Sequence, residues 1–500
     1  MNKIIFLLIA GISINAIQAQ ESRDAIRYSQ DNLNGTARFR AMSGAFGALG
    51  GDLSSINVNP AGSVIFSNNQ LGFTLNNTFV TNKANYFGSS ATETDNSIDL
   101  NQAGGVFVFK NLEKTSNWKK FSFAINFENT NNLNNSIFSA GTNPTNSIAN
   151  YFLYYANGVP LNVLENSSYD QLGHGEQQAF MGYQGYIINP LNTNPNNTNY
   201  NSNVPGSGNY YQENTVTSKG YTGKLSFNAA TSYKDKFYFG LNLNSHFVDF
   251  RQSSRFYEDN NAPLTNNYTV SRVQFDNDLY TYGTGFSFQL GTIAKVTKQL
   301  RLGIAFESPT WLRLNDEFSQ KLVGVSANIT KKLDPDVVDP KVINYYEPYK
   351  LQTPSKWTGS MAYIFGKKGL ISIDYAVKDY SSTRFKPSND SYYRGLNNTL
   401  SNLLNKTKEL RIGAEYKIQA WSLRAGYREE ESPYKNKTTI GDLKGHSAGI
   451  GYNFGGSKLD LSYATFKRNT QQGFFEKGLT DGASINSKNS TVTLTVLFEL

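Results

Sequence analysis

The chain of 500 residues contains no cysteine and carries little charge for its length. The absence of cysteine excludes disulfide scaffolds, thiolate metal sites and a lipoprotein-type modified cysteine. Asp, Glu, Lys and Arg make up only 17% of the residues, and the net charge of +8 comes from basic residues that are scattered along the chain. Scattered positive charge favours an anionic lipid surface or an acidic solute, so we expect no nucleic-acid partner.

Long apolar runs are absent as well. Beyond the N-terminus, no stretch approaches the ~20 apolar residues that a membrane helix needs. At the N-terminus, Lys3 precedes a short apolar core over residues 4–12, and Ala19 offers a small residue before Gln20. This pattern predicts a secretory signal peptide over residues 1–19, cleaved near Ala19. The protein is therefore expected to be exported and, if it enters a membrane, to do so as a β-barrel.

What the chain does contain is aromatic residues in alternating patterns. Tyr (31) and Phe (33) bring the aromatic content to 14%, which is typical of chains rich in β-strands. Within residues 237–246, Phe237, Phe239 and Leu241 share one face, and Asn242 and Asn244 lie on the other. An apolar face opposite a polar face suits a strand between lipid and a wet barrel interior.

Alternation of this kind predicts about fourteen strands. Their expected bounds are residues 70–81, 101–110, 119–130, 220–233, 237–256, 270–296, 300–325, 342–365, 370–385, 406–418, 421–431, 443–454, 459–468 and 490–500. Tight connections alternate with long ones, such as residues 82–100 and 131–219. Outer-membrane barrels have short periplasmic turns and longer outside loops, so this pattern indicates a transmembrane antiparallel β-barrel. The last strand is expected to close it against the first.

Residues 20–69 lack a sustained alternation and precede the expected barrel domain, residues 70–500. Residues 38–62 are rich in Gly, Ala and Ser, whose backbone can approach other atoms closely. We therefore expect residues 20–69 to form an N-terminal luminal hatch. Asp52 is expected to cap a short helix, and Asn59 to take an extended or capping conformation before a helical turn at Pro60. The candidate hatch residues are Gly50, Gly51, Asp52, Asn59, Pro60 and Gly62.

Taken together, the chain resembles the FadL/TodX family, outer-membrane transporters of long-chain fatty acids and other hydrophobic compounds. The resemblance rests on the signal peptide, the strand count, the Ser308-Pro309 turn and the Asn59-Pro60-Ala61-Gly62 element. It implies a Gram-negative outer membrane, insertion by the barrel-assembly machinery, and ligand release when the hatch shifts. It also implies sideways exit through the barrel wall. The third strand lacks a Gly or Pro that would mark an opening, so this exit rests on the resemblance alone.

Candidate ligand-binding residues lie in two regions. Strand parity places Arg411, Arg424 and Arg428 in the lumen, where a guanidinium can pair with a fatty-acid carboxylate. The alternative is that the luminal charges of these strands, which include Glu415 and Lys417, pair with each other or with the hatch. In the long loop, Phe152 and Tyr155 share a helical face. Such apolar faces, including one at residues 396–404, either pack on the barrel rim or form a groove that captures ligand.

No catalytic motif is recognisable, so the protein is not expected to be an enzyme. His174, His246 and His446 are widely separated, which predicts no metal site and no cofactor, and His174 is expected to be solvated. We expect a passive outer-membrane transporter for hydrophobic compounds such as long-chain fatty acids, gated by the hatch and surrounded by outer-membrane lipid. The alternative is a FadL-like barrel that serves as a structural or secretion-associated component.

Overall fold

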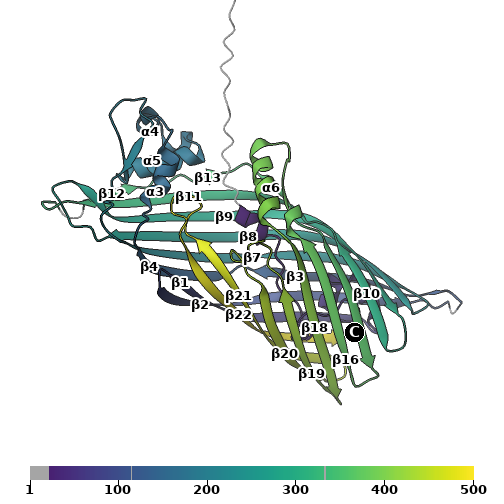
Figure 1. The fold of residues 1–500 in the computed structure, drawn as a ribbon. Coiled ribbons are helices and arrows are strands. Elements are labelled where there is room, and N and C mark those ends of the chain that lie inside the picture. The colour runs from purple at the N-terminus through teal and green to yellow at the C-terminus, as the bar shows by residue number, and fades with distance from the viewer. Residues whose placement is uncertain (1–21, 114, 332–333) are drawn as a thin grey trace, which may run out of the picture.

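The computed structural model describes residues 22–113, 115–331 and 334–500, so the expected signal peptide and its cleavage site lie outside the described residues. Fourteen antiparallel strands, some of them interrupted, form a closed barrel (Figure 1). In order around the barrel they are β1 (Gln70–Tyr86), β2 (Ser89–Lys110), β3 with β4 (Trp118–Asn132, Asn135–Asn143), β7 (Tyr210–Tyr233), β8 (Phe237–Asn260), β9 (Thr269–Lys295), β10 with β11 (Leu300–Glu307, Trp311–Ala327), β12 to β15 (Asp334–Val338, Asn344–Tyr345, Tyr349–Gln352, Lys356–Phe365), β16 with β17 (Gly369–Asp379, Arg384–Lys386), β18 (Lys406–Ile418), β19 (Trp421–Glu430), β20 (Leu443–Asn453), β21 (Ser457–Gly473) and β22 (Gly482–Glu499).

The predicted fold class is confirmed. β22 pairs with β1 from Gln70–Glu499 to Asn85–Ser484, and this ladder closes the barrel as expected for the final strand. All fourteen predicted strands are present, although most are longer than the sequence pattern indicated. The Ser308-Pro309 element lies between β10 and β11, where the Ser308 hydroxyl accepts a hydrogen bond from the Phe288 amide at 2.9 Å.

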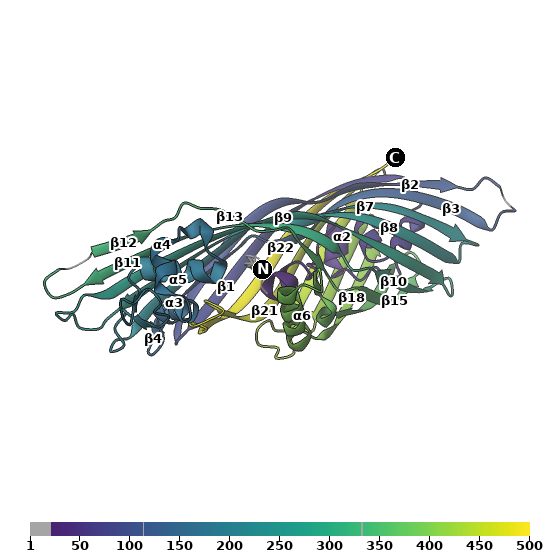
Figure 2. The same cartoon turned by 90° about the horizontal axis from the view of Figure 1, so that it is seen from above.

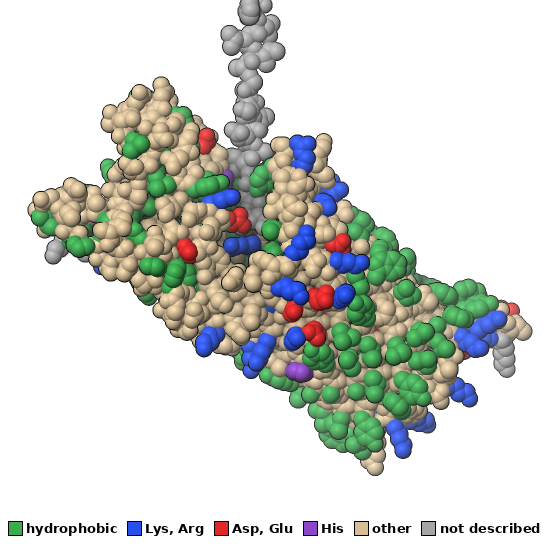
Figure 3. Space-filling model, in the orientation of Figure 1, with side chains coloured by type: hydrophobic (Ala, Val, Ile, Leu, Met, Phe, Trp, Pro, Cys, Tyr) green, Lys and Arg blue, Asp and Glu red, His purple; other side chains and the backbone are tan. Residues whose placement is uncertain are grey.

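The alternation of side chains along each strand determines which residues form the outer surface of the barrel. Phe239, Leu241 and Leu243 of β8 are exposed, whereas Asn242 and Asn244 between them are buried in the lumen. Figure 3 shows apolar side chains gathered over the end of the barrel formed by β15, β16 and β18 to β20. An apolar surface of this extent on a single chain marks a membrane-facing region.

Several predicted loops are shorter in the structure, and residues 82–100 and 131–219 differ most from the prediction. Residues 82–100 form the distal halves of β1 and β2, joined by a two-residue turn at Phe87 and Gly88 with φ of 43° and 84°. Positive φ at both turn residues matches the twist of a tight hairpin. Of residues 131–219, β4 and the first half of β7 are also strand. Both segments are mostly polar, and their inward-facing apolar residues, such as Ala84, Tyr86 and Ile137, are too few to give a sustained alternation.

The remaining insertion after β4 carries a small helical unit. It contains α3 (Ala149–Ala156), α4 (Leu161–Asn166), η3 (Tyr169–Gln171), α5 (His174–Gln184), β5 (Ile188–Pro190) and β6 (Tyr200–Ser202). The predicted helical face in α3 is confirmed, as is the helix α6 (Ser391–Leu403), which follows η4 (Tyr380–Ser382). Phe152 is fully buried against Phe275 of β9, so α3 packs on the extended strands of the wall. In the described ranges, no helix is long and apolar enough to span a bilayer.

The segment before β1 runs through the barrel interior (Figure 2). It consists of α1 (Ser22–Arg27), α2 (Ala37–Ala41), η1 (Leu53–Asn57) and η2 (Pro60–Ile65). Asp52 caps η1 by accepting a hydrogen bond from the Ser54 amide at 2.9 Å. Asn59 is extended and caps η2, with Pro60 as the first helical residue. The expected local roles of these residues are therefore confirmed.

Candidate functional site

The hatch is compact because two segments of its backbone pass close to each other at glycine residues. Gly50 and Gly51 both have positive φ, at 61° and 68°, and the Gly51 amide donates to the Gly62 carbonyl at 3.1 Å. A Cβ at Gly50 would lie 2.8 Å from the Cα of Gly62, so a side chain at position 50 would force these two backbone segments of the hatch apart. Gly50 and Gly62, which are twelve positions apart in the sequence, are therefore in backbone contact.

Glycines of the barrel wall contact the hatch, and these glycines were not among the predicted site residues. A Cβ at Gly240 of β8 would lie under 3.0 Å from the backbone of Pro60 and Ala61. Gly303, Gly413 and Gly426 are similarly close to the backbone of hatch residues 42–48, whereas a Cβ at Gly291 would meet side-chain atoms of Asn59 and Pro60. Each lies at an inward-facing position of its strand, and this position in the alternation is the sequence signal that could have identified it. The inner wall is therefore shaped to accept the hatch backbone.

Polar side chains of the wall then fix the hatch by hydrogen bonds to its backbone. Asn228 donates to the Pro60 carbonyl, Asn242 to the Ile56 carbonyl and Gln289 to the Asn57 carbonyl, all at 2.9 Å. In return, the Asn59 side-chain Nδ2 of the hatch donates to the Thr292 carbonyl at 3.1 Å. Buried polar groups are costly when they are unpaired. These hydrogen bonds pair buried polar groups of the hatch with buried polar groups of the wall.

Replacement of Gly240 by Val is expected to displace the Pro60–Ala61 turn. Overpacking of a filled interior costs about 1–3 kcal/mol, which the hatch relieves by moving away from β8. Faster proteolytic cleavage of the hatch in the folded barrel would show this displacement. The matched control is Gly359→Val on the lipid side of β15, where a Cβ meets nothing within 4 Å. Equal cleavage of both variants would contradict the expected result.

The three luminal arginines are already paired. Arg411 lies 2.7 Å from Glu409, Arg428 lies 2.6 Å from Glu409, and Arg424 lies 2.7 Å from Glu415. The hatch joins this network because Arg38 lies 2.8 Å from Glu415. The structure therefore shows the alternative in which luminal charges pair with neighbours and with the hatch, while ligand binding by the arginines stays a prediction.

Buried charges of the hatch itself are shifted by their surroundings. Burial raises the pKa of Asp52, although Arg38 and the Thr36 hydroxyl oppose that shift. Burial lowers the pKa of Arg40 to about 10, and its Nη1 donates to the Asn34 side chain at 2.8 Å. Arg40 remains cationic at neutral pH, so the hatch carries a positive charge within the lumen.

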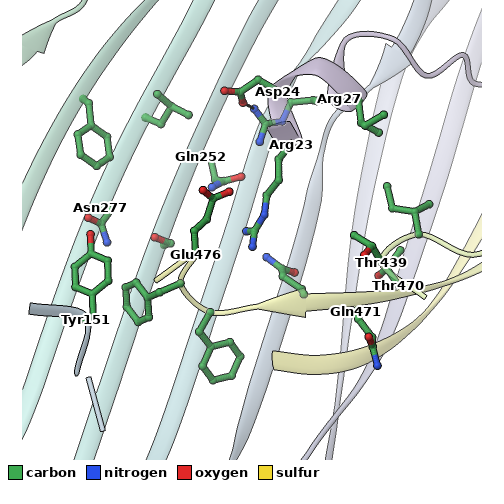
Figure 4. Close-up of a pocket in the computed structure, with 18 of the residues that line it drawn as sticks. Arg23, Asp24, Arg27, Tyr151, Gln252, Asn277, Thr439, Thr470, Gln471 and Glu476 are labelled. Atoms are coloured by element: carbon green, nitrogen blue, oxygen red, sulfur yellow. Dashed lines mark hydrogen bonds and ion pairs between the residues drawn. The ribbon is translucent and has the colours of Figure 1, made fainter. Parts of the chain in front are cut away.

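A cavity of about 400 Å³ lies at the outer end of the lumen. Figure 4 shows its lining: Arg23, Asp24 and Arg27 of α1, Tyr151 of α3, Gln252 and Asn277 of the wall, and Glu476 after β21. Its apolar surface comes from Tyr155, Leu279, Phe318, Phe474 and Phe475. Of the two predicted loop residues, the structure places Tyr155 in the cavity and Phe152 in the loop core behind it.

His174 was expected to be solvated, and that expectation is wrong. It is half-buried in the cavity wall, with its ring 6.2 Å from the rings of Tyr155 and Phe318. Burial lowers the pKa of His174, so the imidazole is neutral at physiological pH. In the described part of the chain, no group of His, Asp and Glu is arranged to hold a metal ion.

The barrel wall is incomplete beside this lumen. The ladder between β2 and β3 ends at Gln102 and Glu128. Beyond that point β2 pairs with β1 only, while β4 pairs with β7, so one edge of β2 has no strand partner in the described ranges. Asp99 accepts hydrogen bonds from Asn129 and Asn132 across the break, at 3.4 and 3.0 Å. The break marks where a sideways exit would lie, and such an exit stays a prediction.

A closed fourteen-stranded barrel with an apolar exterior, a polar lumen and an internal plug is the architecture of an outer-membrane channel protein. The family model described as "Outer membrane protein transport protein (OMPP1/FadL/TodX)" matches residues 190–498, which is more than half of the chain. The chain therefore belongs to the FadL/TodX family of outer-membrane transport proteins. The predicted resemblance is confirmed, and the family is one of transport channels rather than enzymes.

Solved structures agree on the fold. A Pseudomonas aeruginosa FadL homologue has a TM-score of 0.56 at 12% identity, covering 94% of this chain and 99% of that chain. The Pseudomonas putida toluene transporter TodX has a TM-score of 0.50 at 13% identity, covering 94% of this chain and 98% of that chain. A sequence search of curated proteins gave no match. At these identities the likeness shows the fold alone.

Proposed function

We propose that the protein is a passive channel that carries hydrophobic compounds such as long-chain fatty acids across the outer membrane, gated by its hatch. The observation that carries this proposal is the cavity of about 400 Å³ at the outer end of the lumen. Its volume falls within the roughly 300–1,000 Å³ that small-molecule sites occupy. Aromatic side chains from the loops and from the wall converge on it, as a groove for an apolar ligand requires.

The position of the hatch supports gating. Ile26 and Gln30 belong to the N-terminal segment and form part of the cavity lining. Gln30 also lines a second cavity of about 60 Å³ further along the same segment. A ligand that moves inward from the first cavity meets the hatch segment directly. Passage therefore requires that this segment moves, and no covalent or energy-consuming step is needed.

Replacement of Tyr155 or Phe318 by Ala is expected to weaken binding of a fluorescent fatty acid about tenfold, because burial of a large apolar side chain is worth about 1.5–3 kcal/mol. The matched control is Tyr154→Ala, since Tyr154 is exposed and lies outside the cavity lining. Mass spectrometry of purified protein should also detect apolar molecules that co-purify, in smaller amounts with the two cavity variants.

The alternative predicts a different outcome. If the barrel is only a structural or secretion-associated component, no apolar molecule co-purifies and the wild-type protein does not bind fatty acid. Equal binding by the Tyr154, Tyr155 and Phe318 variants would place the ligand somewhere other than this cavity.

A further inference from the structure

Four lysines face outward on the adjacent strands where the barrel closes. Lys444 of β20 is opposite Lys467 of β21, and Lys467 is opposite Lys488 of β22. Since neighbouring strands lie about 4.8 Å apart, these three positions span about 10 Å. Lys83 of β1 extends the series across the closing ladder, two residues beyond the position opposite Lys488. All four side chains are exposed, and together they are called the lysine row.

The lysine row carries more positive charge than the chain neutralises. Lys444 lies 2.9 Å from the Glu429 carboxylate. Within residues 22–113, 115–331 and 334–500, no carboxylate forms an ion pair with Lys83, Lys467 or Lys488. Like charges that are directly opposite on neighbouring strands destabilise a sheet. An anion from outside the chain would offset this repulsion.

The lysine row lies at the outer edge of the lipid-facing surface. On the same face of β21 as Lys467 lie Tyr463 and then Leu461, and both are exposed. Their partners on β22 are Val492 and Leu494, which are exposed as well. Tyrosine is typical of the boundary between hydrocarbon and lipid head groups. Since the long connections mark the outer side of such barrels, the lysine row lies level with the head groups of the outer leaflet.

Hydroxyl groups separate the lysines from the apolar residues. The Ser490 hydroxyl lies 3.1 Å from the Thr465 hydroxyl and 3.3 Å from the Tyr463 hydroxyl. Figure 3 shows Lys and Arg side chains over β20 to β22, beside the apolar end of the barrel. Cations, then hydroxyl donors, then an apolar face is the order of groups that a phosphorylated lipid requires, from its head group to its acyl chains.

We propose that the lysine row binds the phosphate of a membrane lipid in the outer leaflet, whose acyl chains lie on the apolar face of β21 and β22. Each ammonium group acts on the phosphate as a point charge. Because Lys83 and Lys488 lie on opposite sides of the ladder that closes the barrel, one bound lipid offsets the repulsion on both sides of it. This site lies outside the lumen and is independent of the proposed transport.

Replacement of two lysines tests the site in the full-length protein in a neutral detergent, titrated with phosphatidic acid and followed by native mass spectrometry. The variant Lys467→Gln, Lys488→Gln should bind phosphatidic acid at least about tenfold more weakly than wild type, because each lysine near an anionic head group contributes to binding. The variant Lys467→Arg, Lys488→Arg should bind as wild type does. The matched control is Lys435→Gln, Lys437→Gln, which removes the same charge from exposed positions between β19 and β20.

Two further lipid probes distinguish the possible outcomes. Phosphatidylcholine, whose phosphate is balanced by its own ammonium group, should bind all variants equally. Glycerol phosphate, which has the head group without acyl chains, should not displace phosphatidic acid at equal concentration. Equal affinity of wild type and the Lys467 and Lys488 glutamine variant for phosphatidic acid would overturn the proposal, as would an equal loss in the control. Displacement by glycerol phosphate would also overturn it, because the site would then bind a soluble anion.

A second measurement follows the stability of the closed barrel. Phosphatidic acid should raise the unfolding temperature of wild type, because a ligand that binds only the folded state stabilises it. The variant Lys467→Gln, Lys488→Gln should be no less stable than wild type without lipid, since the substitutions remove like-charge repulsion. Its unfolding temperature should not respond to phosphatidic acid. An equal rise in both proteins would contradict binding at the lysine row.

Discussion

Deletion of residues 38–62, with a short Gly/Ser linker in their place, is expected to raise the passage of small polar solutes more than about tenfold. Barrels of eight strands are filled by their own side chains, whereas barrels of 16–18 strands enclose an aqueous channel. A fourteen-stranded barrel lies between these cases. Its lumen is polar and is occupied by the hatch, which wall groups such as Asn228 and Asn242 hold by its backbone. Without the hatch these groups face water.

Single-channel conductance in planar bilayers and solute-induced swelling of liposomes measure this change. The matched control is deletion of residues 191–199, which connect β5 and β6 at the outer surface and do not contribute to the lumen. Both variants should keep the heat-modifiable mobility of a folded barrel on gels. Unchanged conductance after removal of residues 38–62 would show that another part of the chain closes the lumen.

The replacement Glu415→Gln is expected to lower the free energy of unfolding by about 3 kcal/mol. The Glu415 side chain is fully buried between Arg38 of the hatch and Arg424 of β19, at 2.8 and 2.7 Å. Loss of its charge leaves the Arg38 guanidinium without a carboxylate partner in an enclosed site, which is costly. Hatch and wall are joined through this residue, so the variant should also make the hatch more accessible to protease.

Equilibrium unfolding by guanidinium chloride in lipid vesicles measures the free energy. The matched control is Glu429→Gln on the neighbouring strand, where the carboxylate lies 2.9 Å from Lys444 and both side chains are more than one-third exposed. Exposed ion pairs contribute about 1 kcal/mol or less. Similar losses in the two variants would contradict a structural role for the buried network.

The barrel was predictable from the sequence wherever a strand separates lipid from water. In β8 the alternation of Phe239 and Leu241 with Asn242 gave both the strand and its orientation. The same method failed at residues 82–100, because most of these residues are polar and only a few apolar ones, such as Ala84 and Tyr86, mark the inner face. Alternation reports a difference between two environments, so it is silent where both sides of a strand are alike.

The site was predictable only in part. Parity correctly placed Arg411, Arg424 and Arg428 in the lumen, but it could not show which carboxylates neutralise them. Glu415 reaches Arg424, and Glu409 reaches Arg428, through the register between β18 and β19. Register depends on how the strands are staggered around the closed barrel, and that stagger is a property of the whole sheet.

The sequence by itself determined the barrel, its lipid-facing side and a small-residue segment suited to fill the lumen. These follow from local properties: side-chain alternation, loop length, and the close approach that Gly, Ala and Ser permit. Only the tertiary structure decided where that segment sits. Contacts such as Gly240 beneath Pro60, and Asp31 between Lys356 and Lys378, join residues that are far apart in the sequence. They arise because closure of the barrel brings distant strands around one lumen.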